Sequence, residues 1–309
     1  MPQFADTANH APINVQTGYW SYTARSYSDF TVQERGLEGF EQRYRQISKG
    51  TFAGRIESLI AGDLCLSRER SNRAMENEFR FPDNVMCVAL PVGPNSHGTG
   101  SFGSLHPGGA IMPPAGRDNR AYLREGMDLL IVSLPVEPEI HSASIGLEYR
   151  GATFTSWLCT VLDIAREGYA RDDLMRILPD LIRDHLSLLG PASSSERGSS
   201  RRDFAIFDEI VAACERLMPE DLTVSGLSAR LDRSRAELRK ACLALTETRL
   251  DDLLAAWRRN DVYRTLRTNP DKQSIGEIAL DYGYMHAGRF SLAFREMFGM
   301  RPKDARDSI

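Results

Sequence analysis

The sequence of 309 residues contains no long apolar run and only five cysteines. No segment approaches the roughly 20 apolar residues that a membrane-spanning helix needs. The N-terminal stretch MPQFADTANHAPINVQ lacks a basic region followed by an apolar core, so we predict no signal peptide. The cysteines show no C-x-x-C spacing, which disfavours a disulfide framework and a zinc site: Cys65, Cys87, Cys159, Cys214 and Cys242. These absences indicate a cytoplasmic protein that does not associate with membranes.

Signatures of catalysis are also missing. The six histidines include no H-x-H pair, and no carboxylate lies at a spacing typical of metal ligands. The sequence has no nucleophile motif of the G-x-S-x-G kind. We therefore expect no metal, no cofactor and no enzymatic activity. A cupin-type enzyme with a regulatory tail is an alternative that the missing ligands disfavour.

The charge of the chain does not by itself indicate a nucleic-acid partner. The formal net charge is −4. Residues 201–309 carry 19 basic and 18 acidic side chains, whereas residues 1–200 carry 19 basic and 24 acidic side chains. This difference has the sign that a C-terminal DNA-binding region requires, but it is too small to indicate one.

Residue patterns divide the chain into a strand-rich part and a helical part. Residues 51–136 hold short β-favouring runs separated by Gly, Pro and Asn-Asp turns, which predict a small antiparallel barrel or sandwich. Residues 190–202, GPASSSERGSSRR, are rich in Ser and Gly and predict a flexible linker. After this linker we expect only helices, so the predicted fold class is α+β.

Two amphipathic helices are expected just before the linker, in residues 155–189. Asp172-Asp173 is a natural start for the second helix, whose apolar positions form one stripe. Two such helices in succession make a hairpin that can bury its stripes against a partner subunit. We therefore expect a homodimer held by side chains of the second helix: Leu174, Leu178 and Leu181.

The clearest motif lies near the C-terminus, in residues 275–298. The helix that starts near His286 repeats apolar residues at i, i+4, i+7 and i+8, namely Phe290, Phe294, Met297 and Phe298. The helix before it begins with the capping-box sequence SIGE at Ser274, and Gly283 can adopt the positive φ of a tight turn. Helix, turn and amphipathic second helix predict a helix-turn-helix whose second helix fits a major groove.

Residues 224–245 show the same arrangement more faintly. Thr223 caps a first helix, Asp232-Arg233 makes a turn, and Ser234 caps a second helix. The connecting segment 249–266 would span roughly 27 Å as a helix. Two reading helices on one face of DNA lie about 34 Å apart. The connector therefore has about the length that sets two recognition helices in successive major grooves.

The segment from Ile275 to Pro302, IGEIALDYGYMHAGRFSLAFREMFGMRP, resembles the most recognisable part of the AraC/XylS transcriptional regulators. That family has an I-A-x-x-x-G-F/Y motif, followed by F-S-x-x-F-K/R and F-G-x-x-P. The resemblance covers about residues 204–306. The sequence departs from the family at Thr246, where Gly is usual, at Arg249, where Pro is frequent, and at Gly288, which replaces a polar residue.

The resemblance implies an architecture for the whole chain. The strand-rich part is similar to the family's cupin-like sensor, beginning with YRQISKGTFAGRIESLIAGDLCLSRERSNRA. The implied parts are a cupin-like effector-sensing domain (1–153), a dimerising helical hairpin (154–189), the linker (190–202) and an AraC-type DNA-binding domain (203–309) with helix-turn-helix units 224–245 and 275–298.

The resemblance also implies a function. The chain is expected to be a sequence-specific, DNA-binding activator of transcription that responds to a small-molecule or nucleotide effector and contacts RNA polymerase. A dimeric DNA-binding regulator without an effector is the alternative. We expect residues 203–309 to bind DNA as a fragment, with Arg289 as the best base reader because Arg can bond bidentately to guanine. The candidate DNA contacts are Arg235, Arg239, Lys240, Met285, His286, Gly288, Arg289, Leu292 and Arg295.

Arginines of the strand-rich part are the candidate effector contacts. Arg68 and Arg70 alternate along a predicted strand and so project to one face, with Arg55 on the strand before and Arg73 shortly after. Such a cluster can bind an anion or phosphate, and the alternative is a solvated, salt-bridged turn. Family members that respond to cyclic dinucleotides carry an R-x-x-x-R segment ahead of the barrel. Here only Arg120–Arg124 has that spacing, inside the predicted barrel.

Overall fold

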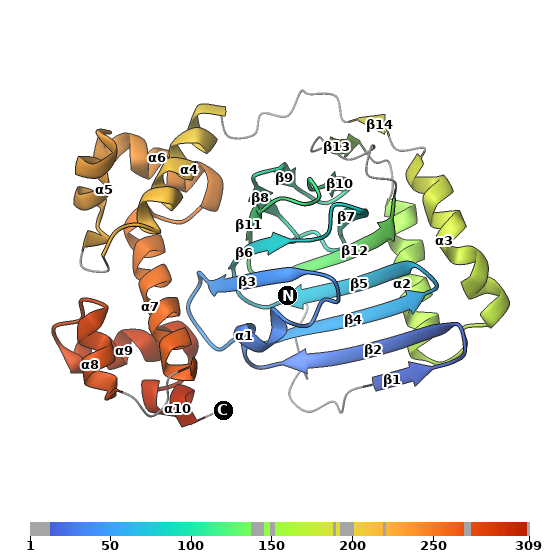
Figure 1. The fold of residues 1–309 in the computed structure, drawn as a ribbon, viewed down its shortest axis with the longest axis horizontal. Helices are drawn as coiled ribbons and strands as arrows, with labels where there is room; N and C mark the ends of the chain where they lie inside the picture. The colour runs from blue at the N-terminus through green and yellow to red at the C-terminus, as the bar shows by residue number, and fades with distance from the viewer. Residues whose placement is uncertain are drawn as a thin grey trace. The chain divides into compact units, whose positions relative to one another are not determined.

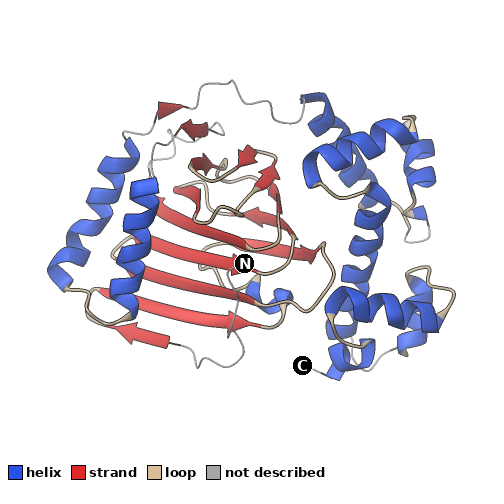
Figure 2. Ribbon diagram, turned by 180° about the vertical axis from the view of Figure 1, so that it is seen from behind, coloured by secondary structure: helices blue, strands red, loops and turns tan. Residues whose placement is uncertain are grey.

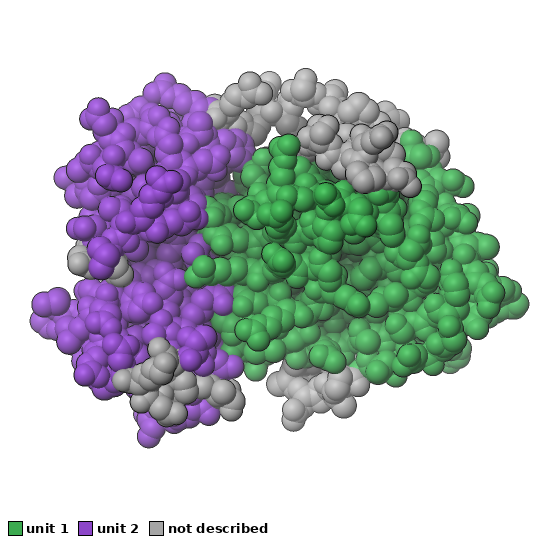
Figure 3. Space-filling model, viewed as in Figure 1, with its two compact units in different colours: residues 1–44, 53–196 green, residues 45–52, 197–309 purple. Residues whose placement is uncertain are grey.

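The computed structural model describes residues 13–136, 145–148, 152–187, 190–191, 201–218, 221–268 and 273–307. The chain forms two compact units, which Figure 3 colours separately. The first comprises residues 1–44 and 53–196, and the second comprises residues 45–52 and 197–309. Most of the predicted linker, residues 192–200, lies outside the described residues. The sequence did not indicate that a short segment of the strand-rich part belongs to the helical unit.

The first unit is built on two sheets (Figure 1). The larger has the strand order β1-β2-β4-β5-β12-β7-β10-β13-β14, and the smaller has the order β3-β6-β11-β8-β9. A short helix, α1 (Phe30–Gln33), follows the second strand. The strands are β1 (Ile13–Gln16), β2 (Trp20–Tyr27), β3 (Glu41–Gln46), β4 (Gly54–Ala61), β5 (Leu64–Ser71), β6 (Met75–Arg80), β7 (Val85–Pro91), β8 (Gly98–Gly100), β9 (Gly103–Leu105), β10 (Gly109–Met112), β11 (Asn119–Leu123), β12 (Met127–Pro135), β13 (Ile145–Glu148) and β14 (Gly190–Pro191).

Strand β12 shows how the sequence determines the layers. Its residues MDLLIVSLP are apolar on both sides because the strand pairs with β5 and β7 and both of its faces are covered. Leu130 and Val132 belong to the core between the larger sheet and the helices that follow it. Leu129 and Ile131 point the other way and belong to the clusters on the opposite face of the sheet.

Helices α2 (Ala152–Arg166) and α3 (Asp172–Ser187) cover one face of the larger sheet (Figure 2). The predicted apolar stripe of α3 is divided between two sides of the helix. Leu178 is only 4% exposed and packs in the core, whereas Leu174 and Leu181 are 56% and 48% exposed. The prediction that Leu178 is available for a dimer contact is wrong, because the sheet of its own unit takes that side of α3.

After the linker, the described residues of the second unit form helices, as predicted, including both helix-turn-helix units and the connector between them. Among the described residues, no helix is both long enough and apolar enough to cross a membrane. The helices are α4 (Arg201–Cys214), α5 (Val224–Leu231), α6 (Arg235–Thr246), α7 (Leu250–Thr268), α8 (Ile275–Asp281), α9 (Ala287–Phe298) and α10 (Pro302–Asp307).

Residues 45–52 are held in the helical unit by buried hydrogen bonds. The Gln46 amide donates to Oδ1 of Asn260 in α7 (2.9 Å), and Asn260 Nδ2 donates back to the Gln46 carbonyl (2.8 Å). The Gln46 side chain donates to the Met297 carbonyl at the end of α9 (2.7 Å), as does the Gly50 amide (3.0 Å). Gln46 and Asn260 are both 0% exposed, so these bonds satisfy polar groups that water does not reach.

Candidate nucleic-acid interface and internal cavity

The second helix-turn-helix unit consists of α8, a tight turn and α9. Ser274 and Glu277 form the predicted capping box, in which each side chain accepts from the other residue's backbone amide. Gly283 has φ +76°, a left-handed conformation that glycine adopts without strain. His286 occupies the N-cap of α9, but its side chain makes no capping hydrogen bond. The first amides of α9 are therefore not satisfied by a capping side chain.

The inner face of α9 is aromatic. Phe290, Phe294 and Phe298 are buried, with successive ring centroids 5.7 and 4.8 Å apart. Tyr263 of α7 lies against this row, with its ring centroid 6.0 Å from that of Phe294 and 4.8 Å from that of Phe298. The predicted apolar face is thus the one that fixes α9 on the connecting helix.

The opposite face of α9 and the turn before it are exposed. Met285 and Leu292 are large apolar side chains that are 77% and 61% exposed. Arg289 and Arg295 are exposed too, and neither forms an ion pair with any described residue. All six candidates of this unit are exposed: Met285, His286, Gly288, Arg289, Leu292 and Arg295.

The first helix-turn-helix unit has the same architecture in α5 and α6. Asp232 ends α5 in a left-handed conformation (φ 50°), and Ser234 forms a capping box with Glu237 at the start of α6. The hydrogen bonds from Ser234 lower the pKa of Glu237. Burial raises the pKa of Cys242 to about 12, so this thiol stays protonated within the apolar inner face of α6.

The outer face of α6 carries the three predicted basic residues, all exposed: Arg235, Arg239 and Lys240. Arg239 forms an ion pair with Asp251 (3.1 Å), whereas Arg235 and Lys240 have no such partner among the described residues. Leu243 is 52% exposed one turn beyond Arg239 and was not among the residues predicted to contact DNA. Its spacing was the available signal, because it departs from the inner face that Leu238 and Leu245 define.

The connecting helix α7 lies between the two helix-turn-helix units. Its 19 residues correspond to about 28 Å at 1.5 Å per residue. Its buried residues come from most of its circumference, as expected of a helix packed on several sides. They are Leu250, Leu253, Leu254, Ala256, Trp257, Asn260, Val262, Tyr263 and Leu266.

Comparison with known proteins agrees with this geometry. Residues 227–308 match the model of a family described as a helix-turn-helix domain. The XylDLEGF operon transcriptional activator 2 of Pseudomonas putida is 43% identical over 49 residues, which are 15% of this chain and 31% of that protein. The C-terminal region is a helix-turn-helix domain of the AraC/XylS family. Because the match spans less than a third of the relative, it concerns the AraC/XylS domain alone.

Two solved structures of low similarity align over most of the chain. ToxT from Vibrio cholerae is 9% identical with a TM-score of 0.31, over 87% of this chain and 98% of that one. The AraC-like transcriptional activator CuxR is 16% identical with a TM-score of 0.36, over 84% of this chain and 99% of that one. Neither likeness is close enough to carry an argument about what lies outside the AraC/XylS domain.

The arginines predicted to bind an effector are paired with carboxylates. Arg68 makes two hydrogen bonds to Asp128 (2.8 and 2.7 Å). Arg55 and Arg70 both contact Glu57, at 3.2 and 2.6 Å. The fourth candidate, Arg73, lies 3.3 Å from Glu125. This geometry matches the salt-bridged alternative that the sequence left open.

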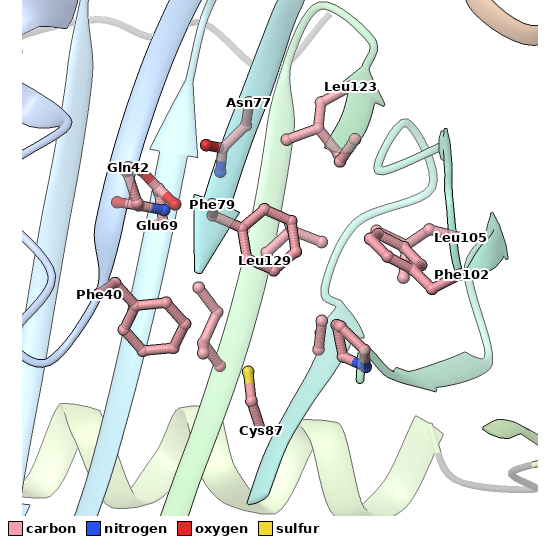
Figure 4. Close-up of a pocket in the computed structure, with 14 residues that line it drawn as sticks. Phe40, Gln42, Glu69, Asn77, Phe79, Cys87, Phe102, Leu105, Leu123 and Leu129 are labelled. Atoms are coloured by element: carbon pink, nitrogen blue, oxygen red, sulfur yellow. The ribbon is translucent and has the colours of Figure 1, made fainter. Parts of the chain in front are cut away.

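An internal cavity lies between the two sheets, on the face of the larger sheet opposite to α2 and α3 (Figure 4). Its volume is about 50 Å³. The described residues contain no cluster of three or more potential metal ligands, here or elsewhere. The lining residues are Phe40, Gln42, Glu69, Asn77, Phe79, Cys87, Ala89, Phe102, Leu105, Pro113, Ala121, Leu123, Leu129 and Ile131.

Proposed function

We propose that the protein is a sequence-specific DNA-binding regulator that activates transcription. The observation that carries this proposal is the pair of helix-turn-helix units joined through α7, each with an exposed outer face on its second helix. A helix of this kind enters the major groove, and units about one helical turn apart read successive grooves. Activation follows the function named for the Pseudomonas putida relative, and implies contact with RNA polymerase.

The exposed residues of α9 divide into two roles. Arg289, near the start of the helix, reads a base edge, since a free guanidinium bonds bidentately to guanine O6 and N7. Leu292 and Met285 are placed to contact thymine methyl groups, which are the apolar feature of the major groove. Arg295, near the end of α9, contacts phosphate. On α6, the basic residues Arg235, Arg239 and Lys240 take the equivalent positions.

The strand-rich compact unit, residues 1–44 and 53–196, then senses an effector and dimerises. Its cavity is the effector site, since ligand sites are concave, mainly apolar and equipped with few polar groups. The dimer forms through the exposed side of α3, where Leu174, Ile177 and Leu181 are about half exposed. A regulator that dimerises without an effector is the second candidate. Neither version requires enzymatic activity, a metal or a cofactor.

Binding-site selection with the full-length protein tests the proposal. We expect one enriched motif with two parts about one DNA turn apart, and an affinity that falls steeply with salt as phosphate contacts require. Recovery of no motif, with no binding even at low salt, would refute it.

Light scattering of an Ile177→Asp and Leu181→Asp double variant tests the dimer, with Asp184→Ala on α3 as the control. A double variant that stays dimeric would move the interface elsewhere.

A further inference from the structure

The cavity between the two sheets of the strand-rich compact unit is apolar over most of its wall and polar at one end. Phe40, Phe79 and Phe102 lie around it (Figure 4). The ring centroids of Phe79 and Phe102 are 5.9 Å apart, with an angle of 59° between the ring planes. Burial raises the pKa of the Cys87 thiol to about 12, so this group is neutral. Phe102 is half-buried on the turn between β8 and β9.

The polar end consists of Gln42, Glu69 and Asn77. Glu69 is 2% exposed and accepts hydrogen bonds from the Tyr44 hydroxyl and from Gln33 Nε2 (3.0 Å). Both bonds go to Oε1, which leaves Oε2 to accept a further donor. Asn77 is 6% exposed, and its buried Oδ1 has no hydrogen-bond partner. The cavity therefore presents acceptors that still require donors, because an unsatisfied buried acceptor is costly.

Burial raises the pKa of the Glu69 carboxyl, and no cation in the described part of the chain offsets it. Among the described residues, none of the ion pairs includes this carboxyl, and its hydrogen-bond partners are both neutral. The nearby arginines do not change this, because strand alternation turns Arg68 and Arg70 to the opposite face, where they bind Asp128 and Glu57. A carboxylate or phosphate placed in the cavity would meet the Glu69 carboxyl and no positive charge, although the amide groups of Gln42 and Asn77 also carry donors.

We infer that this cavity binds a small aromatic molecule bearing an uncharged or cationic hydrogen-bond donor, such as an alcohol or an amine, and rejects anions. The aromatic part packs against the phenylalanine rings, which favour tilted contacts with another ring. The donor bonds to Glu69 and Asn77. This inference rests on the proposed function only in taking the cavity as the effector site. It replaces the anionic effector that the arginine cluster suggested.

Four probes that share a phenyl ring test the ligand class on the full-length protein. They are benzylamine, benzyl alcohol, toluene and benzoate, with binding measured by calorimetry and by the shift in melting temperature. We expect benzylamine and benzyl alcohol to bind about tenfold or more tightly than toluene, since they satisfy a buried acceptor. Benzoate is expected not to bind. Benzoate binding as tightly as benzyl alcohol would overturn the inference, as would failure of both donor probes to bind.

Two variants show whether the probes occupy this cavity. Ala121→Leu fills the cavity and should abolish binding of every probe. Glu69→Gln keeps an acceptor for Tyr44 and Gln33 but removes the carboxyl that can pair with an ammonium group, so it should weaken benzylamine about tenfold and leave benzyl alcohol nearly unchanged. Glu38→Gln, an exposed carboxyl of the same unit, is the matched control. Melting of each variant without probe reports whether it folds.

Failure of this inference can be told apart from failure of the proposed function. Unchanged probe affinity in Ala121→Leu and Glu69→Gln, both folded, would place the binding elsewhere and overturn the inference. Site-specific DNA binding of the same preparations without any probe decides the proposed function independently. A protein that selects a DNA motif but prefers benzoate would remain a regulator with a different class of effector.

Discussion

The two helix-turn-helix units have the same architecture but satisfy their polar groups differently. In the first unit, Ser234 caps the second helix, and Arg239 on its outer face is paired with Asp251. In the second unit, the capping box lies on the first helix, and the second helix begins at His286 without a side-chain cap. The second unit thus leaves more hydrogen-bond donors open to a partner.

Their cores differ as well. The inner face of α6 consists of aliphatic side chains and one cysteine, whereas the inner face of α9 is a row of phenylalanines stacked along Tyr263. Aromatic rows bury more area per residue and fix their geometry through ring contacts. The comparison suggests that α9 is the more rigidly held helix and also the one with more open donors, a combination suited to reading bases.

The largest contrast between the two cores is expected for their central residues. Phe294→Ala should destabilise the second helix-turn-helix unit by about 3–5 kcal/mol because it removes a fully buried ring. Cys242→Ala in the first unit should cost roughly 1 kcal/mol, since it removes a single buried atom. Hydrogen exchange of the α6 and α9 amides in the full-length protein measures both. Equal losses would remove the contrast between the cores.

The outer faces should differ in specificity. Arg289→Ala is expected to relax the preference at one base pair by about 1–3 kcal/mol, because a bidentate contact is lost. Arg239→Ala should change specificity less, since Asp251 already holds its guanidinium. Binding-site selection on each variant checks this, with the exposed Arg230→Ala of α5 as a control. An unchanged motif for Arg289→Ala would show that α9 does not read a base there.

The helix caps should have similar effects on stability, of about 1 kcal/mol each, and different effects on DNA binding. Ser234→Ala removes the cap of α6, and Ser274→Ala removes that of α8, each at a cost of about 1 kcal/mol. Only the former should loosen a recognition helix directly, so DNA binding should weaken more for Ser234→Ala at equal loss of stability. Thermal unfolding and DNA titration of both variants provide the test. Equal effects on DNA binding would contradict it.

Arg295→Ala should have a smaller and different effect. A phosphate contact weakens binding alike on all sequences, and its loss should lower the slope of log K against log salt by about 1. Titrations of the selected site and of a scrambled site at several salt concentrations measure this. A change in motif preference would instead make Arg295 a base reader.

The smallest effect concerns pH. The backbone amide and hydroxyl of Ser274 lower the pKa of Glu277, as those of Ser234 do for Glu237. Because the folded pKa lies below the unfolded one, the stabilisation is complete above the unfolded value of about 4.3 and disappears as pH falls through the folded value. The free energy of unfolding of the native sequence should therefore fall between pH 6 and pH 3, and this part of the pH dependence should be missing in Glu277→Gln. Unfolding curves recorded across this pH range measure the difference.

Local signals predicted the DNA-binding half well and long-range packing poorly. Thr223, Ser234 and Ser274 mark helix starts through bonds to residues three positions away, so the sequence alone reveals them. Periodicity could not decide that Leu178 faces the sheet while Leu181 faces outward, since that depends on where α3 packs.

The cavity was hidden for the same reason. Glu69 and Asn77 come from different strands, and neither lies in a recognisable motif. The conspicuous run around Arg68 instead drew attention to side chains that fold against carboxylates. Residues that meet through the pairing of distant strands leave no signature in spacing along the chain.

The segment 45–52 has a practical meaning for anyone who exchanges domains among related regulators. A single junction in the linker would transplant the helical half without Gln46, and would leave the Asn260 amide facing whatever residue the host supplies. A faithful graft needs two junctions, one on each side of this segment, in addition to the linker. Modularity in this chain is therefore a property of its three-dimensional contacts, and a hybrid designed by cutting the sequence once would inherit a mismatched core.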